Sequence, residues 1–252
     1  MKMKHYLSPA IAAIALLAMP WLAFAQGPQG QMPGLNAAMA KFFGNNNAFT
    51  AAVTATVLDA AGKETMAMPM SYALLEGKIR SEMDMTQVKS KELQGNAAAS
   101  LKQMGMDRMI SIVRPDKQVV YVIYPSLRAY AETPMSKTQS GSPNQEYKID
   151  STPLGKEMVN GHPCEKNKVV VSGANNEKHE AIVWNATDLK NFPVKMQMSQ
   201  SGISTVMTYS DIKFDKPDAK LFDPPAGFEK YDSVEKMMQS AMMKLFGTPP
   251  PP

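Results

Sequence analysis

Hydrophobic and polar residues alternate in short runs between residues 49 and 214. In the first run, Phe49–Leu58, every second residue starting at Phe49 is apolar. Alternation with a period of two predicts β-strands, because successive side chains of a strand point to opposite faces of the sheet. With the turn residues between the runs, the pattern predicts ten strands, at residues 49–58, 65–75, 78–85, 109–113, 118–124, 128–132, 165–172, 180–185, 194–200 and 204–214.

The number and spacing of these runs predict the fold class. Many short strands separated by Gly, Pro, Asn and Asp residues are typical of an all-antiparallel sheet. A sheet with this many strands closes into a barrel or curves strongly on itself. We therefore expect a mainly β domain, with a sheet that is either a barrel or strongly curved.

A helical pattern interrupts the strands once. The stretch Asn96–Met104 is rich in alanine, with Asn96 placed to cap its start and Gly105 its end. The surrounding segment, residues 88–105, is inserted between two predicted strands. We expect this segment to form a helical lid or plug. Another short helix is predicted over residues 35–43.

A strongly amphipathic helix is predicted near the C-terminal end. Asp232 and Glu235 have the spacing of a capping box, and Gly247 is placed to end the helix. The apolar stripe has helical spacing and consists of Val234, Met237, Met238, Ala241, Leu245 and Phe246. Thr248 and four prolines follow it as a stiff tail.

The first 25 residues predict export. Lys2 and Lys4 form a basic start, the apolar run Ala10–Leu22 follows, and Ala23–Ala25 supplies small residues for cleavage after Ala25. This is the pattern of a secretory signal peptide, and its apolar core is too short to span a bilayer. We expect a periplasmic protein with no transmembrane segment in the mature chain. The expected organisation is a signal peptide at 1–25, a flexible linker at 26–34, a β domain at 35–231 with a lid around 88–105, and a helix with a Pro-rich tail at 232–252.

Charge and cysteine content narrow the functional classes. The predicted signal peptide holds two of the 27 Lys and Arg residues and none of the 23 Asp and Glu residues, so the remainder carries a formal net charge of +2. Such a small charge, without a basic block, indicates no nucleic-acid partner. Cys164 is the single cysteine, so no internal disulfide can form. We expect Cys164 to act as a small apolar residue in a strand.

Motifs that carry catalysis are missing from the sequence. It has no nucleophile elbow, no phosphate-binding glycine loop and no H-E-x-x-H motif. After the predicted signal peptide only His162 and His179 remain, and the pair His162 and Cys164 has no partner pair with zinc-ligand spacing. We expect no enzyme activity, no cofactor and no resident metal.

Methionine is the outlier of the composition, with 22 residues that occur in close groups. Residues two apart on a strand share a face, so the strand methionines are expected to project together. Flexible thioether side chains suit a surface for apolar ligands of variable shape, but they also select Cu(I), and they fill ordinary cores. The residues predicted to contact an apolar ligand are Met66, Met68, Met70, Met83, Met85, Met196 and Met198.

Three segments resemble a known group of periplasmic proteins. Residues 154–166 contain G-x-E-x-V-x-G-x-x-C, residues 184–195 read W-x-x-x-x-L-x-x-x-P-x-K, and residues 221–228 read L-F-x-x-P-x-G-F. Their order and spacing resemble a domain-of-unknown-function family of the lipoprotein-localisation-carrier-like (LolA/LolB-like) superfamily. The likeness extends over about residues 49–231.

This resemblance implies an unclosed half-barrel, a curved antiparallel sheet whose apolar concave face is covered by a few helices. Carriers of the superfamily hold the acyl chains of lipoproteins on that face, and relatives bind other lipids or sense lipoproteins. The group itself has no assigned activity. The lipid-contacting residues of the carriers form no motif in this sequence, so none is carried over.

The first hypothesis is therefore a non-enzymatic periplasmic binding protein or carrier for a lipid or other apolar ligand. The first alternative is an envelope interaction or scaffold module that docks on a protein partner through residues 232–247, whose methionine-rich stripe suits a groove. The second alternative is a Cu(I)-handling protein that uses its Met-x-Met pairs.

Overall fold

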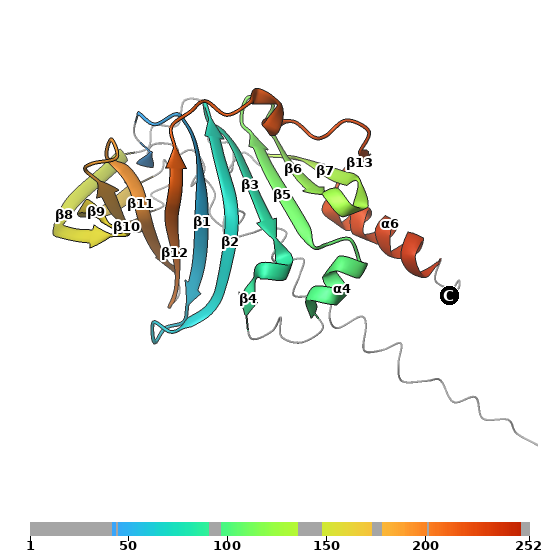
Figure 1. Cartoon of the computed structure of the whole chain (residues 1–252), viewed down its shortest axis with the longest axis horizontal. Coiled ribbons are helices and arrows are strands. Elements are labelled where there is room, and N and C mark those ends of the chain that lie inside the picture. The colour runs from blue at the N-terminus through green and yellow to red at the C-terminus, as the bar shows by residue number, and fades with distance from the viewer. Residues whose placement is uncertain are drawn as a thin grey trace, which may run out of the picture.

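The computed structural model describes residues 42–43, 45–90, 97–135, 148–172, 178–200 and 202–247. Thirteen strands of this part form one sheet (Figure 1). The predicted signal peptide, the linker, most of the helix predicted at 35–43, residues 91–96 of the predicted lid and the Pro-rich tail lie outside the described residues.

The strands are β1 (Ala48–Leu58), β2 (Glu64–Leu75), β3 (Lys78–Asp84), β4 (Lys89–Ser90), β5 (Arg108–Arg114), β6 (Val119–Tyr124), β7 (Ala129–Pro134), β8 (Lys148–Val159), β9 (His162–Ser172), β10 (Lys178–Ala186), β11 (Phe192–Gln200), β12 (Ile203–Lys213) and β13 (Glu229–Tyr231). The helices are η1 (Met85–Gln87), η3 (Pro125–Leu127) and η4 (Ala219–Phe222), which are 3₁₀-helices, and the α-helices α4 (Ala97–Gln103) and α6 (Val234–Phe246).

The sheet is open and curved, as Figure 1 shows. Its strand order is β13-β7-β6-β5-β3-β2-β1-β12-β11-β10-β9-β8, with β4 paired to β2 outside this path. Strands β13 and β8 are its two edges. All pairings are antiparallel except that between β13 and β7. The expected mainly β, unclosed fold is confirmed, and the barrel alternative is wrong for the described sheet.

Strand β1 holds the two halves of the sheet together. It pairs with β2 on one side and with β12 on the other. The strands from β1 to β7 and the strands from β8 to β12 therefore form one continuous sheet. Residues on β1 alternate between buried and less buried positions along the strand. Because side chains of a strand alternate between faces, β1 contributes Phe49, Ala51, Val53 and Ala55 to one face only.

Strand β8 was not predicted. Its residues are exposed except for Val159, so no hydrophobic alternation marks it. It also contains Pro153 and Gly155, residue types that are depleted in strands, and its pairing with β9 shifts register there. As an edge strand it is held by backbone pairing with β9. The short strands β4 and β13 were missed as well, since two or three residues show no period.

The two faces of the sheet differ. We call the face with Val53, Tyr72 and Met196 the concave face, and the face with Ile112 and Tyr121 the convex face. Curvature towards the concave face brings the rings of Phe49 on β1 and Phe192 on β11 to 4.8 Å, although β12 lies between these strands. Two strand spacings correspond to about 10 Å in a flat sheet.

Helix α6 covers one end of the concave face. Its Met237 is buried against β6 and β7, and Figure 1 shows the helix lying beside these strands. The predicted end of the helix is confirmed, because Gly247 is its C-cap and has a positive φ. The predicted capping box is wrong in one respect: Ser233 is the N-cap, and its hydroxyl accepts a hydrogen bond from the Lys236 amide. Asp232 instead contacts the Lys236 ammonium group.

Helix α4 lies where the lid was predicted. It ends before Gly105, whose φ is +68° and whose added Cβ would lie 2.6 Å from Leu127 Cδ2. A larger residue at this position would therefore be both strained and obstructed. Leu101 is the buried residue of the helix. The described part of the predicted lid is therefore packed onto the domain through Leu101.

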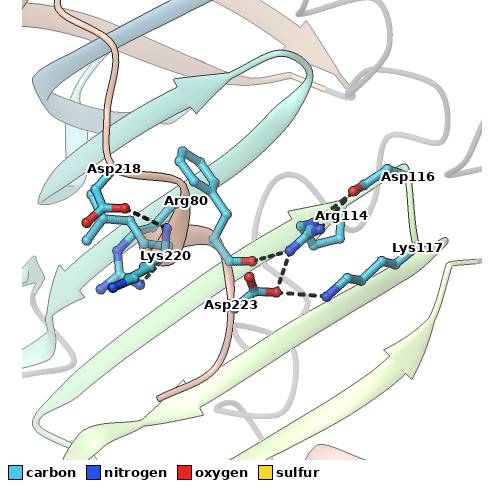
Figure 2. A network of polar contacts seen from close by, with 9 residues as sticks. Arg80, Arg114, Asp116, Lys117, Asp218, Lys220 and Asp223 are labelled. Atoms are coloured by element: carbon cyan, nitrogen blue, oxygen red, sulfur yellow. Dashed lines mark hydrogen bonds and ion pairs between the residues drawn. The ribbon is translucent and has the colours of Figure 1, made fainter. Parts of the chain in front are cut away.

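The convex face carries a polar clamp, shown in Figure 2. The Arg114 guanidinium donates two hydrogen bonds of 2.8 Å to Asp116 and one of 2.9 Å to the carbonyl of Phe222. It also bonds Asp223, which accepts a further hydrogen bond from Lys117. The hydrogen bonds from Arg114 lower the pKa of Asp116 to about 2. The clamp fixes η4 to β5 as the chain leaves β12 and crosses to β13.

Candidate binding face

A row of methionines crosses three neighbouring strands on the concave face. Met70 of β2 lies opposite Met83 of β3, and Met83 lies opposite Met109 of β5. Directly opposed residues of antiparallel strands have Cβ atoms about 5 Å apart, so these thioethers form a continuous strip. The Tyr124 hydroxyl contacts Met109 Sδ at 3.6 Å at the end of the strip.

A second row alternates large and small side chains. Met68 of β2 lies opposite Ala55 of β1, Ala55 lies opposite Met207 of β12, and Met207 lies opposite Met196 of β11. The small Ala55 leaves room between flexible neighbours. Because methionine has three rotatable bonds, such a row can adapt its shape without moving the backbone.

The structure places all seven predicted methionines in or against one hydrophobic cluster on the concave face. Met68, Met196 and Met198 are buried, and the half-buried ones are Met66, Met70, Met83 and Met85. The prediction missed two further methionines of these rows, Met109 and Met207. Met207 follows the alternation of β12, and this period was the available signal. Whether these residues contact a ligand stays a prediction.

Aromatic side chains gather at one end of the cluster. Phe43 lies before β1 and contacts the rings of Phe49, Tyr72, Phe192 and Tyr209, with ring centroids 4.8 to 6.2 Å apart. All five side chains are almost completely buried. Aromatic side chains bury large apolar surfaces, so this cluster contributes strongly to the burial energy at this end of the face.

Two hydroxyl groups in this aromatic region are unusual. Tyr72 is 2% exposed and Tyr209 is 1% exposed, and neither hydroxyl has a hydrogen-bond partner among the described residues. Their rings meet edge to face with centroids 6.2 Å apart. Burial raises the pKa of both phenols well above the ordinary value, so both groups stay protonated. Sequence reasoning did not find this pair.

The remaining candidates for chemistry do not form a site in the described part of the chain. His162 Nδ1 lies 2.8 Å from Asp188 Oδ2, and the Cys164 thiol contacts the carbonyl oxygen of His162 at 3.4 Å. Within the described ranges, no three His, Cys, Asp or Glu side chains group as metal ligands. None of the helices described here has the length and hydropathy of a membrane span.

We predict that Cys164→Ala leaves the protein folded and costs about 1 kcal/mol of unfolding free energy, as expected for a small loss of buried apolar volume. Cys164 is 2% exposed, and burial raises the pKa of its thiol, so it is a poor nucleophile. Urea denaturation measures the cost, and a thiol reagent should label the native protein only in urea. Rapid labelling of the native protein, or a disulfide-linked dimer on non-reducing gels, would contradict this role.

The geometry defines an open, curved antiparallel sheet with a methionine-rich apolar face. The chain belongs to the family described as Domain of unknown function (DUF4412), whose model matches residues 49–191. This confirms the predicted membership of a domain-of-unknown-function family. No curated protein matches the chain.

Solved structures with a similar fold include a LolA superfamily protein from Nitrosomonas europaea, with 11% identity, 76% of this chain and 97% of that chain covered, and a TM-score of 0.37. The lipoprotein LppX from Mycobacterium tuberculosis is 12% identical over 71% of this chain and 95% of that chain, with a TM-score of 0.40. A putative outer membrane lipoprotein-sorting protein domain from Vibrio parahaemolyticus is 13% identical over 81% and 97%, with a TM-score of 0.32. At these identities the likeness is one of fold.

Proposed function

We propose that this protein is a non-enzymatic periplasmic binding protein or carrier that holds a lipid or other apolar molecule on its concave face. The observation that supports this most is the pair of methionine rows, in which thioethers from neighbouring strands lie side by side on one apolar surface. The half-buried methionines of the rows still expose apolar surface, which a bound ligand would cover. The predicted signal peptide supports the compartment.

The choice of residues favours a ligand of variable shape. A core made only for stability is typically filled by branched side chains with few rotamers, whereas methionine adapts to what it contacts. Apolar ligands are held by the same burial that stabilises a core, roughly 25 cal/mol for each Å² removed from water. A concave apolar face with adaptable side chains therefore suits an acyl chain.

The proposal predicts that Met70→Gln together with Met83→Gln weakens binding of a fluorescent fatty-acid probe by about 30-fold. Glutamine has nearly the shape of methionine but is polar, so each change removes roughly 1 kcal/mol of apolar contact at a half-buried position. The dissociation constant is measured by titration, alongside mass spectrometry of lipids extracted from protein purified from a periplasm.

The matched control is Met242→Gln with Met243→Gln, two exposed positions on α6. This variant carries the same chemical change away from the rows and should bind the probe as the unmodified protein does. A protein that yields no apolar molecule on extraction and binds no probe would overturn the proposal. Equal weakening in both double variants would argue against the concave face as the site.

A second candidate function is docking of an envelope partner through α6. The observation in its favour is the exposed apolar end of the helix, formed by Met242, Met243 and Leu245. The first half of the predicted stripe is used inside the molecule, because Val234, Met237 and Met238 pack against the sheet. Docking therefore has only the last turns of α6 available.

Cu(I) handling remains the other interpretation of the methionines. The row Met70, Met83 and Met109 places three soft ligands on adjacent strands, which is the feature that suits Cu(I). The methionines of the two rows are distributed over five strands, β2, β3, β5, β11 and β12, and have alanine, valine and tyrosine as neighbours on the same face. This distribution fits a lining better than a compact set of ligands, so we rank apolar binding first.

A further inference from the structure

The concave face is not uniformly apolar, because two tyrosine hydroxyls lie within its most buried part. Tyr72 on β2 and Tyr209 on β12 flank β1, where Tyr72 lies opposite Ala51 and Tyr209 lies opposite Val53. The smaller side chains on β1 allow both rings to lean over this strand. The two phenols thus approach each other from strands that are not neighbours.

The hydroxyls are energetically unfavourable as they stand. A buried donor without an acceptor forfeits the hydrogen bond that water would give it, and native proteins rarely retain such groups without a reason. Phenylalanine would fill the same volume without this cost, and Phe43, Phe49 and Phe192 do so around them. Among the described residues, the buried side chains with unpartnered polar atoms are these two tyrosines and Asp107.

We propose that the hydroxyls of Tyr72 and Tyr209 form a polar subsite that donates hydrogen bonds to an uncharged carbonyl oxygen, the ester or amide of an acyl lipid held on the concave face. This proposal rests on the proposed function and names its ligand class. The acyl chain of the lipid follows the methionine rows, which begin next to the tyrosines: Met70 lies opposite Val53, and Val53 lies opposite Tyr209.

The surroundings favour an uncharged carbonyl over a carboxylate. Among the described residues the one buried charged side chain is Arg114, which lies in the clamp on the convex face, so no buried Lys or Arg lies beside these tyrosines to pair with an anion. An ionised group buried without a partner carries a large desolvation cost, whereas a neutral carbonyl needs only one or two donors. Because the phenols stay protonated, they can serve as those donors at any pH in the working range.

Phe43 closes this subsite in the structure. It precedes β1, belongs to no strand, and packs on both tyrosine rings with centroids 6.2 and 5.7 Å away. It is therefore the member of the aromatic cluster that can withdraw without breaking the sheet. In the proposed bound state the acyl carbonyl region takes the place of the Phe43 ring.

The test compares three ligands and two variants. The ligands are methyl palmitate, which carries a neutral ester, palmitate, which carries a carboxylate, and hexadecane, which has no acceptor. The variants Tyr72→Phe and Tyr209→Phe should each weaken binding of methyl palmitate by about tenfold, the equivalent of one hydrogen bond, and leave hexadecane binding unchanged. Tyr121→Phe, at a buried position on the convex face, is the matched control and should change neither.

Stability separates this subsite from a structural role. Removing an unpartnered hydroxyl should leave the unfolding midpoint of the free protein unchanged or higher. A clear loss of stability in Tyr72→Phe or Tyr209→Phe, with no change in ligand preference, would overturn the proposal, because the hydroxyls would then be satisfied within the protein.

Ligand preference distinguishes a failure of the tyrosine subsite from a failure of the proposed carrier function. If all three ligands bind equally well to the unmodified protein and the variants, the subsite is wrong and the carrier function stands. Tightest binding of palmitate would also overturn the choice of a neutral carbonyl. If none of the three ligands binds, the proposed function itself fails. Phe43→Ala should strengthen binding of methyl palmitate, since the ring that closes the subsite is then absent.

Discussion

Replacing Phe222 by alanine is expected to lower the free energy of unfolding by about 3–5 kcal/mol. Phe222 belongs to η4 and is completely buried on the convex face, where it packs against Ile112, Tyr121 and Ile123. Large-to-small changes at such sites lose the burial energy of the ring and leave a void. Urea denaturation of the purified protein measures the change.

The adjacent Leu221 provides the control. It lies on the same 3₁₀-helix but is 41% exposed, so Leu221→Ala should change stability by less than about 1 kcal/mol. The backbone contacts of the segment persist in both variants, since Arg114 and Arg80 bond the carbonyl oxygens of Phe222 and Leu221. Similar losses in the two variants would show that the side chain of Phe222 does not hold this segment.

The packing of Phe222 matters for the binding face because the chain continues from η4 to α6. The chain passes from β12 across the convex face, is fixed there by Phe222 and the Arg114 clamp, and then forms β13 beside β7. Helix α6 follows directly and covers part of the concave face. A loosened η4 would therefore free the cover on the opposite side of the sheet.

The strands and their faces were readable from the sequence. Alternation in β1 predicted which residues share a face, and the spacing of Met66, Met68 and Met70 predicted that these side chains project together. The turn residues marked most of the strand ends. Such features depend on neighbours within a few residues, which is the range over which a sequence pattern is informative.

Features set by distant pairing were not readable. The alignment of Met70 with Met83 and Met109 depends on the register of two strand pairs, and the approach of Tyr72 to Tyr209 depends on β1 pairing with β12. One residue of slippage would turn these side chains to the other face. The edge strand β8 lacked a hydrophobic period, because neither of its faces is buried.

The first half of α6 is a cover of the concave face, although the sequence pattern of this helix also suits docking on a protein partner. Met237 is almost completely buried against Val122, Tyr124 and Ala131. The helix is also tied to β13, since the Tyr231 hydroxyl donates a hydrogen bond of 2.9 Å to Ser240 and Lys244 donates one of 2.7 Å to Glu229.

We expect Met237→Ala to lower the free energy of unfolding by about 2–4 kcal/mol, because the change creates a void between α6 and the sheet. Met243→Ala is the matched control: it lies on the same helix, is 38% exposed, and should cost less than about 1 kcal/mol. Alanine favours helix at both positions, so helix propensity does not separate them. Equal, small effects would mean that the helix is not packed as a cover and would favour a docking element. A large loss confined to Met237→Ala, with retained packing of the rest of the sheet, would establish α6 as the structural cover of the β6–β7 end of the binding face.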